Sequence, residues 1–359
     1  TAIMMPLLMT TVVSLVPAAN RGRLMGRISI VISVAPAIGP TLSGFVLEHL
    51  SWRAIFLIVL PIAVVSLILG ILRMPDVGEQ SHARIDAFSV VLTVFAFGGI
   101  VYGLSAFGER ANGGETLPPW IPLIVGVIGL AVFVQRQLRL QREDRALLDL
   151  RTFRVRPFWL STVLFVFCSI ALFGSLILLP IYVQNVLGYS TLDSGLMLLP
   201  GGLLMGLLGP LVGRRIDARG TRSTLIPGVA ISAAALWAMG LFSETTPLRQ
   251  VILTHIVLSF GLACTFTPLF SVSLGSLPPK LMSHGSATIS TAQQVAGAAG
   301  TALFVTVMTL VSVRAAGSPE AVGPEALAAG TRAAFLLGGV ASTLAIAAAW
   351  FIRDPEPRP

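Results

Sequence analysis

Apolar runs long enough to cross a lipid bilayer recur along the whole chain of 359 residues. A membrane-spanning helix needs about 20 apolar residues. Only 11% of the residues are charged, whereas about 25% are charged in a typical soluble domain. These features exclude a soluble enzyme, a nucleic-acid-binding domain and a secreted disulfide scaffold. They predict an all-α polytopic membrane protein with eleven transmembrane segments: 1–17, 24–47, 54–72, 87–107, 120–135, 158–182, 195–213, 223–243, 249–275, 285–313 and 333–352.

The basic residues give the orientation of these segments. When successive segments alternate in direction, 19 of the 24 lysines and arginines fall on one side of the membrane. Basic loops stay in the cytoplasm, so the net charge of +8 reports topology and not a nucleic-acid partner. The chain has 23 arginines against one lysine and lacks Asn-x-Ser/Thr sequons, which favours a bacterial inner (cytoplasmic) membrane, crossed many times.

The segments group as three, two and six. We predict a partial N-terminal bundle at 1–73, two inserted helices with cytoplasmic linkers at 74–156, and a six-helix C-terminal bundle at 157–359. The arginine-rich stretch 135–157 has leucines spaced among its charges. This pattern is typical of an amphipathic helix on the membrane surface, and a solvated linker is the alternative.

The most specific pattern lies between Gly26 and Gly44. Small residues and one proline follow each other at fixed intervals: Gly26, Ala35, Gly39, Pro40, Ser43 and Gly44. Small residues let a second helix approach closely, and a proline bends its helix. The pattern therefore predicts a bent, tightly packed helix seam, although ordinary helix packing also places small residues four apart.

A charged turn separates the segments 195–213 and 223–243. Its residues are Gly213, Arg214, Asp217, Gly220 and Arg222. Asp217 is expected to cap the following turn or to accept hydrogen bonds from nearby arginines, and Gly220 to permit a tight reversal. Such a turn can act as a gate between two conformations. A basic topology anchor is the alternative.

Polar residues within or beside apolar segments are candidates for a substrate or proton path. They are Tyr182, Gln184, Asn185, His255, Gln293 and Gln294. Tyr182, Gln184 and Asn185 also suit the headgroup zone, and His255 suits a hydrogen bond to a neighbouring helix. Gln293 and Gln294 either line a cavity or join helices. No acidic residue lies at the centre of a segment.

These motifs resemble a known family. The series from Gly26 to Gly44 resembles the antiporter motif in the fifth helix of drug:proton antiporters of the major facilitator superfamily, with Ala35 and Ser43 at two glycine positions. The turn 213–222 resembles the Gly-x-x-x-Asp-x-x-Gly-x-Arg loop found in each half of these proteins. Trp52, Arg53, Phe56 and Pro61 resemble the start of the sixth helix in the 14-helix branch.

The resemblance implies the major facilitator fold, with the chain supplying helices 4–14 of a 14-helix scheme. It implies proton-coupled multidrug efflux by alternating access, with amphipathic or cationic drugs as the substrates. The proton-carrying acid is then expected in the first helix and an arginine shortly before Thr1. We therefore expect Thr1 to begin an N-terminally truncated fragment.

The expected partners are a small-molecule substrate and the lipid bilayer. The proton gradient is the expected energy source, and no cofactor, metal ion or catalytic residue is expected, since the four histidines are scattered and no Gly-x-x-x-x-Gly-Lys loop occurs. Export of a specific natural product, siderophore or lipid is the alternative substrate class. A non-transporting fragment or accessory protein is the alternative of another kind, and the residues do not address periplasmic adaptor proteins.

Overall fold

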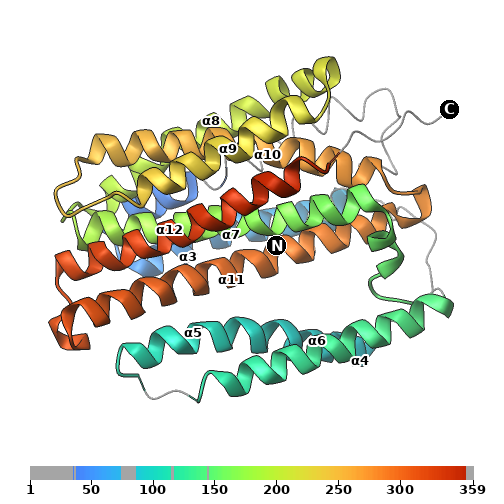
Figure 1. The fold of residues 1–359 in the computed structure, drawn as a ribbon, viewed down its shortest axis with the longest axis horizontal. Coiled ribbons are helices and arrows are strands. Elements are labelled where there is room, and N and C mark those ends of the chain that lie inside the picture. Colours follow the sequence, from blue (N-terminus) through green and yellow to red (C-terminus); the bar gives the residue numbers. More distant parts are fainter. Residues whose placement is uncertain (1–34, 36–37, 74–85, 115–116, 144, 353–359) are drawn as a thin grey trace.

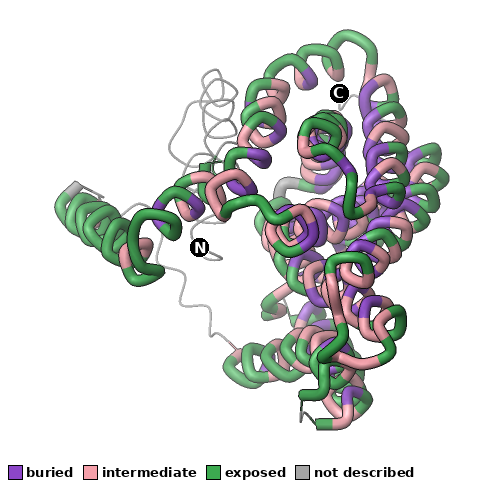
Figure 2. Tube along the Cα trace, turned by 90° about the vertical axis from the view of Figure 1, so that its left-hand side faces the viewer, coloured by how far each residue is buried: buried purple, intermediate pink, exposed green. Residues whose placement is uncertain are grey.

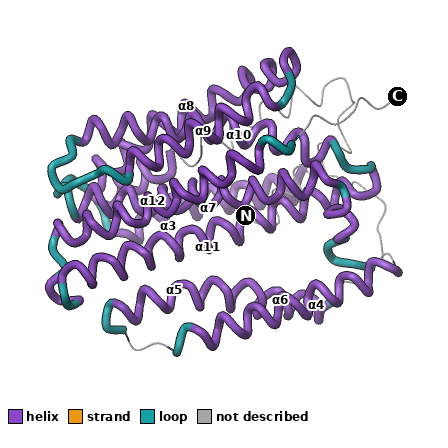
Figure 3. The backbone as a smooth tube through the Cα atoms, viewed as in Figure 1, coloured by secondary structure: helices purple, strands orange, loops and turns teal. Residues whose placement is uncertain are grey.

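The computed structural model describes residue 35 and residues 38–73, 86–114, 117–143 and 145–352. Within these ranges the chain is helical and has no strand (Figure 3). Residues 38–49 form a helix, and the elements that follow are α3 (Trp52–Arg73), α4 (Ala87–Thr93), the π-helical η1 (Val94–Gly98), α5 (Gly99–Ala111), α6 (Trp120–Leu140), α7 (Arg156–Asn185), α8 (Thr191–Arg219), α9 (Arg222–Met239), α10 (Leu248–Gly275), α11 (Met282–Ala316) and α12 (Pro324–Ala349).

Nine helical spans in the described ranges are long and apolar enough to cross a membrane. They coincide with the last nine predicted segments, and α4, η1 and α5 together form one of them. The first predicted segment, 1–17, lies outside the described residues, and the second, 24–47, is described only at Ala35 and from Ile38 onward. The total of eleven segments therefore stays a prediction.

Several helices extend beyond the apolar runs. α8 continues six residues past the predicted end of its segment, to Arg219, and α12 begins at Pro324 and not at residue 333. A helix forms its own backbone hydrogen bonds both in hydrocarbon and in water. Charged and polar residues at the membrane surface can therefore extend a helix without loss of backbone hydrogen bonds. Hydropathy marks the part of a helix that lies in hydrocarbon, which is shorter than the helix.

The helices α7 to α12 form one bundle with a continuous core. Figure 1 shows them lying side by side along the long axis of the molecule. In Figure 2 the buried residues, in purple, lie mostly on the sides of helices that face other helices. Tyr182 stacks on Phe242 with ring centroids 5.5 Å apart, and Phe335 contacts Phe242 and Phe304 edge-on at 6.2 and 6.3 Å. These aromatic contacts tie α7, α11 and α12 to the turn that follows α9.

The inserted helices form a hairpin that packs on α11 (Figure 1). Glycines let the two arms of the hairpin, α5 and α6, approach closely. A Cβ on Gly126 of α6 would lie only 2.5 Å from the backbone nitrogen of Ile100 in α5. Gly108 of α5 lies against Thr306 of α11, whose hydroxyl donates to the Leu104 carbonyl at 2.9 Å. The hairpin is therefore attached to the C-terminal bundle through small residues, while the division at 73/74 and 156/157 stays a prediction.

The stretch after α6 is not the amphipathic helix that the leucine spacing favoured. Its described residues form two short 3₁₀ turns, Gln141–Glu143 and Leu150–Arg154. The side-chain oxygen of Gln137 accepts hydrogen bonds from the backbone of Leu147 and Leu148 at 2.9 and 3.2 Å. These bonds hold the chain folded back against α6. The spacing of the leucines gives no sign of this contact, because it is made by a glutamine side chain.

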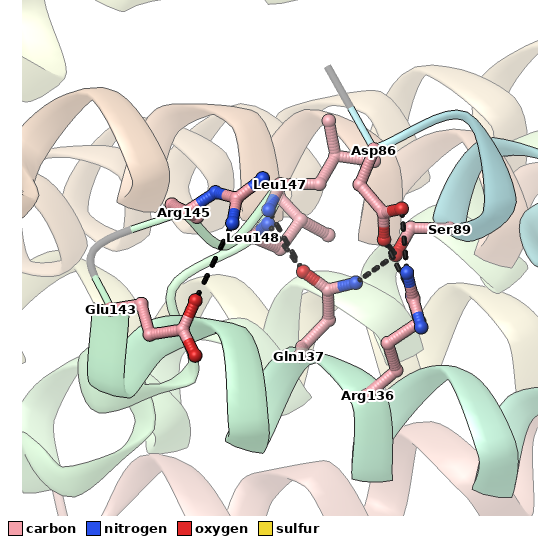
Figure 4. A network of polar contacts seen from close by, with 8 residues as sticks. All are labelled: Asp86, Ser89, Arg136, Gln137, Glu143, Arg145, Leu147 and Leu148. Carbon is pink, nitrogen blue, oxygen red and sulfur yellow. Dashed lines mark hydrogen bonds and ion pairs between the residues drawn. The ribbon is translucent and has the colours of Figure 1, made fainter. Parts of the chain in front are cut away.

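A polar network anchors this turn to the start of α4 (Figure 4). Arg136 donates from Nε and a terminal nitrogen to the Asp86 carboxylate at 2.5 and 2.7 Å, and Ser89 donates to the same group at 2.5 Å. Gln137 donates to Ser89 at 2.8 Å. The hydrogen bond from Arg136, followed by that from Ser89, holds the pKa of Asp86 far below its usual range and outweighs the effect of its partial burial.

This network predicts a pH-dependent stability. Because its folded-state pKa is depressed, Asp86 stabilises the fold above the unfolded-state pKa of about 3.9 and loses that effect as the pH falls below it. We expect Asp86→Asn to lower the melting temperature in detergent by a few degrees at pH 7, and the difference from the original protein to shrink below about pH 4.

Glu109→Gln is the matched control, because Glu109 is exposed at the other end of the hairpin and has no ion pair among the described residues. It should leave the melting temperature unchanged at both pH values. An Asp86→Asn protein as stable as the original at pH 7 would contradict the anchoring role.

Candidate functional site

The helix 38–49 packs against the first turn and a half of α8, across about 150 residues of sequence. A Cβ on Gly44 would lie 2.6 Å from the carbonyl oxygen of Thr191, and a Cβ on Gly195 would lie 2.6 Å from that of Pro40. The two backbones touch where each helix has a glycine. We call this contact, formed by Pro40, Thr41 and Gly44 with Thr191 and Gly195, the outer seam.

Hydrogen bonds reinforce the outer seam. Thr41 donates from its hydroxyl to the Gly195 carbonyl at 2.9 Å. The Glu48 carboxylate accepts from the backbone N–H of Leu192 at 3.2 Å, where the free N–H groups of a helix start favour negative charge. The seam therefore combines close backbone contact with polar bonds between residues of different segments.

The predicted antiporter residues have different places relative to this seam. Gly44 and Pro40 form it, Ser43 is half-buried and Ala35 is exposed. Gly39 has nothing within 4 Å of a Cβ position among the described residues, and Gly26 lies outside them. The predicted site residues did not include Thr41, Glu48, Thr191 or Gly195, because a single sequence does not indicate which helices are in contact.

The charged turn after α8 is shorter than the sequence suggested. Because α8 runs to Arg219, only Gly220 and Thr221 separate it from α9. Gly220 has φ +78°, a conformation that disfavours a side chain. Arg222 donates to the carbonyls of Ile352 and Trp350 at 2.7 and 2.6 Å. These two bonds hold the start of α9 to the end of α12, within one bundle.

The role expected for Asp217 differs from its observed place. It lies in the last turn of α8, exposed, so it does not cap α9, whose start has no side-chain cap. Neither Asp217 nor the exposed Arg214 forms an ion pair within the described ranges. Gly213 is half-buried, with nothing within 4 Å of a Cβ position among the described residues. The expectation that Asp217 caps or accepts from arginines was therefore wrong for this conformation.

The outer end of α7 presents three of the predicted polar residues. Tyr182 is buried, and its hydroxyl donates to the Ser243 carbonyl at 2.5 Å. This hydrogen bond gives the tyrosine a packing role in this conformation. Gln184 donates to the Ser194 hydroxyl at 2.8 Å, which joins α7 to α8, and Asn185 is exposed.

His255 lies buried between α10 and α8. Its side chain faces Gly201, where a Cβ would come within 2.6 Å of the imidazole and 2.5 Å of the Ser259 hydroxyl. Its Nδ1 atom has no hydrogen-bond partner among the described residues, although a buried polar atom without a partner costs free energy. Gly201 thus leaves space for the imidazole of His255, whose Nδ1 atom has no hydrogen-bond partner among the described residues.

Gln293 and Gln294 lie on α11, where they precede its crossing with α7. Gln293 is half-buried and Gln294 is exposed. One turn further along, Gly297 faces the ring of Phe173, and Gly300 lies against the backbone of Ile170. Gly297 and Gly300 therefore make the close approach of α11 to α7 at this crossing.

Comparison with known proteins shows the family of this chain. The family model described as Major Facilitator Superfamily matches residues 1–301. The chain belongs to this superfamily. It is 37% identical over 360 residues to a lincomycin resistance protein of Listeria monocytogenes serovar 1/2a, covering 99% of this chain and 75% of that protein.

Two further relatives carry resistance names. A lincomycin resistance protein of Bacillus subtilis strain 168 is 37% identical over 359 residues, which are 98% of this chain and 74% of that protein. A multidrug resistance protein B homolog of Mycobacterium tuberculosis strain H37Rv is 30% identical over 290 residues, 80% of this chain and 53% of that protein. The protein is a multi-span membrane transporter with bacterial relatives, and not an enzyme.

The outer seam predicts that Gly44→Leu separates helix 38–49 from α8. Because the seam has no space for a side chain, overpacking by about 1–3 kcal/mol should open it. We expect a cysteine at the buried Ser194 position, in a background with Cys168 and Cys264 replaced by alanine, to react faster with a membrane-impermeant maleimide when Gly44→Leu is present.

Gly70→Leu is the matched control, because a Cβ there has nothing within 4 Å among the described residues. It should change neither labelling nor the amount of protein in the membrane. Equal labelling rates with and without Gly44→Leu would show that the seam does not close this end.

Proposed function

We propose that the protein is a proton-coupled exporter of amphipathic or cationic drugs, working by alternating access in the bacterial inner membrane. Lincomycin is the first substrate to test, because two relatives that share 37% identity are named for resistance to it. We place the protein in the 14-helix drug:proton antiporter branch, with the hairpin of α4, η1, α5 and α6 as the two extra helices.

The outer seam is the observation that carries the proposal. Alternating access needs a contact between the two halves that closes one side of the membrane and separates to open it. The positive-inside rule assigns the seam to the outer side, since α8 begins there and ends at the arginines Arg214, Arg215 and Arg219. Helix 38–49 belongs to the first predicted half and α8 to the second, so the seam is suited to this gating role.

The substrate and proton path is proposed to use polar groups that the fold leaves available. The Nδ1 atom of His255 has no partner among the described residues, and Asn185, Gln293 and Gln294 carry amides near helix crossings. Gln184 is available only when its hydrogen bond to Ser194 breaks. Tyr182 is left out of the path because its hydroxyl is engaged by Ser243. On the cytoplasmic side, Arg214 and Asp217 are exposed and therefore available to bind the opposite half in another conformation.

Drug accumulation in cells tests the function. A lincomycin-sensitive bacterial host expressing the gene in its native reading frame, with any coding sequence upstream of Thr1, should accumulate less lincomycin than the host with an empty vector. An ionophore that collapses the proton gradient should restore accumulation to the level of the empty vector, because efflux would then lose its driving force.

The other candidate functions give different results in the same assay. Reduced accumulation that persists after the proton gradient collapses would contradict proton coupling. Unchanged accumulation of lincomycin and of cationic dyes, with the protein present in the membrane, would contradict multidrug export and favour a specific natural product, siderophore or lipid as the substrate, or a non-transporting role.

His255 gives a sharper test of the path. His255→Leu replaces the imidazole by an apolar side chain and so removes the Nδ1 atom. Because a buried unsatisfied atom costs about 1–3 kcal/mol, the melting temperature should stay equal or rise. We expect transport per molecule of inserted protein to fall markedly. Ser273→Ala is the control, since the buried Ser273 hydroxyl on α10 also has no partner in the part of the chain that the structure describes, and this variant should transport normally. Normal transport by His255→Leu would remove the histidine from the path.

A further inference from the structure

A pocket of about 470 Å³ lies at the cytoplasmic ends of the helices, outside the outer seam and the His255 region. Its wall on one side is the turn that leads from α6 into α7, and on the other the turn from α10 into α11. The lining residues with charge or titratable groups are Asp149, Arg151, Lys280 and His284. Its volume is in the range of small-molecule sites.

Arg151 is held in a fixed orientation at this pocket. Its Nε and one terminal nitrogen donate to the buried Asp149 carboxylate at 2.8 and 2.6 Å, and its backbone N–H donates to the same group at 2.9 Å. Burial raises the pKa of Asp149, but the hydrogen bonds from Arg151 and the charges of Arg151 and His284 outweigh it, so the pKa lies below its usual range. Asp149 therefore stays ionised and neutralises one positive charge.

Lys280 leaves the pocket with a net positive charge. It is exposed in the short 3₁₀ turn Pro279–Leu281, and no ion pair to it occurs among the described residues. With Arg151 and Asp149 offsetting each other, the lining has a formal charge of +1 from Lys280, and the half-buried His284 adds an imidazole that can donate a hydrogen bond. Pro278 and Leu281 supply apolar surface beside these charges.

We propose that this pocket binds a phosphate group, with Lys280 and His284 as the groups that contact it and the Arg151–Asp149 pair as its fixed wall. Lysine binds phosphate as a point charge, and a basic pocket between helices at the cytoplasmic surface suits an anionic lipid headgroup. The apolar surface from Pro278 and Leu281 fits the glycerol end of such a lipid. A bound phosphate would bridge the two turns, independently of which substrate the transporter carries.

Native mass spectrometry of the purified, delipidated protein tests the proposal. The probes are dioleoyl phosphatidylglycerol, the neutral dioleoyl phosphatidylcholine, and inorganic phosphate, each titrated separately. We expect phosphatidylglycerol to bind more tightly than phosphatidylcholine, and Lys280→Gln to weaken it about fivefold, the effect of about 1 kcal/mol for one basic residue at a membrane surface. Lys280→Arg should restore the affinity.

Arg142→Gln is the matched control, because Arg142 is exposed on the linker that contains Asp149 and carries the same charge as Lys280, but does not line the pocket. It should leave phosphatidylglycerol affinity unchanged. An equal loss in Arg142→Gln and Lys280→Gln would overturn the proposal in favour of general surface attraction. Binding of inorganic phosphate that depends on Lys280, without lipid binding, would support the site with a soluble phosphate as its ligand, and no binding of either probe would overturn it.

Discussion

Hydrocarbon offers no hydrogen-bond partner to a backbone N–H or C=O group, and the rest of this structure depends on that constraint. Each described span is helical because a helix pairs its own backbone groups, and the remaining freedom is how closely two helices approach. Glycines set that distance at the main crossings, at Gly126 against Ile100, Gly300 against Ile170 and Gly44 against Thr191. The helices of this protein therefore pack through direct backbone contacts as well as through large apolar side chains.

The two ends of the molecule are held by different kinds of contact. At the outer end, helix 38–49 meets α8 through glycines, Thr41 and Glu48, so residues distant in sequence form a close seam. At the cytoplasmic end, arginines bind within the bundle or within the hairpin, as in Arg222 with the end of α12 and Arg136 with Asp86. Under the proposed alternating access, the outer seam is the contact that separates, while the arginine contacts keep each unit rigid.

Sequence patterns predicted the helical spans well and the polar contacts poorly. Hydropathy placed nine described spans, but it ended the segment of α8 at Gly213 because the following turn is charged. The leucine spacing after α6 favoured an amphipathic helix, whereas Gln137 holds the backbone of Leu147 and Leu148 in a tight turn. Tyr182 has the sequence context of a membrane-surface residue, but its hydroxyl reaches the carbonyl of Ser243, 61 residues away.

The sequence alone determined the membrane environment and predicted an orientation and a small-residue seam, because apolar length, arginine distribution and small-residue spacing are local properties of the chain. Only the tertiary structure decided which surfaces meet: Gly44 with α8, Gly201 with His255, and Lys280 with the turn that contains Asp149. These pairings join residues that are 50 to 150 positions apart, and the free energy of such a contact depends on the packing of both helices, which no local pattern records.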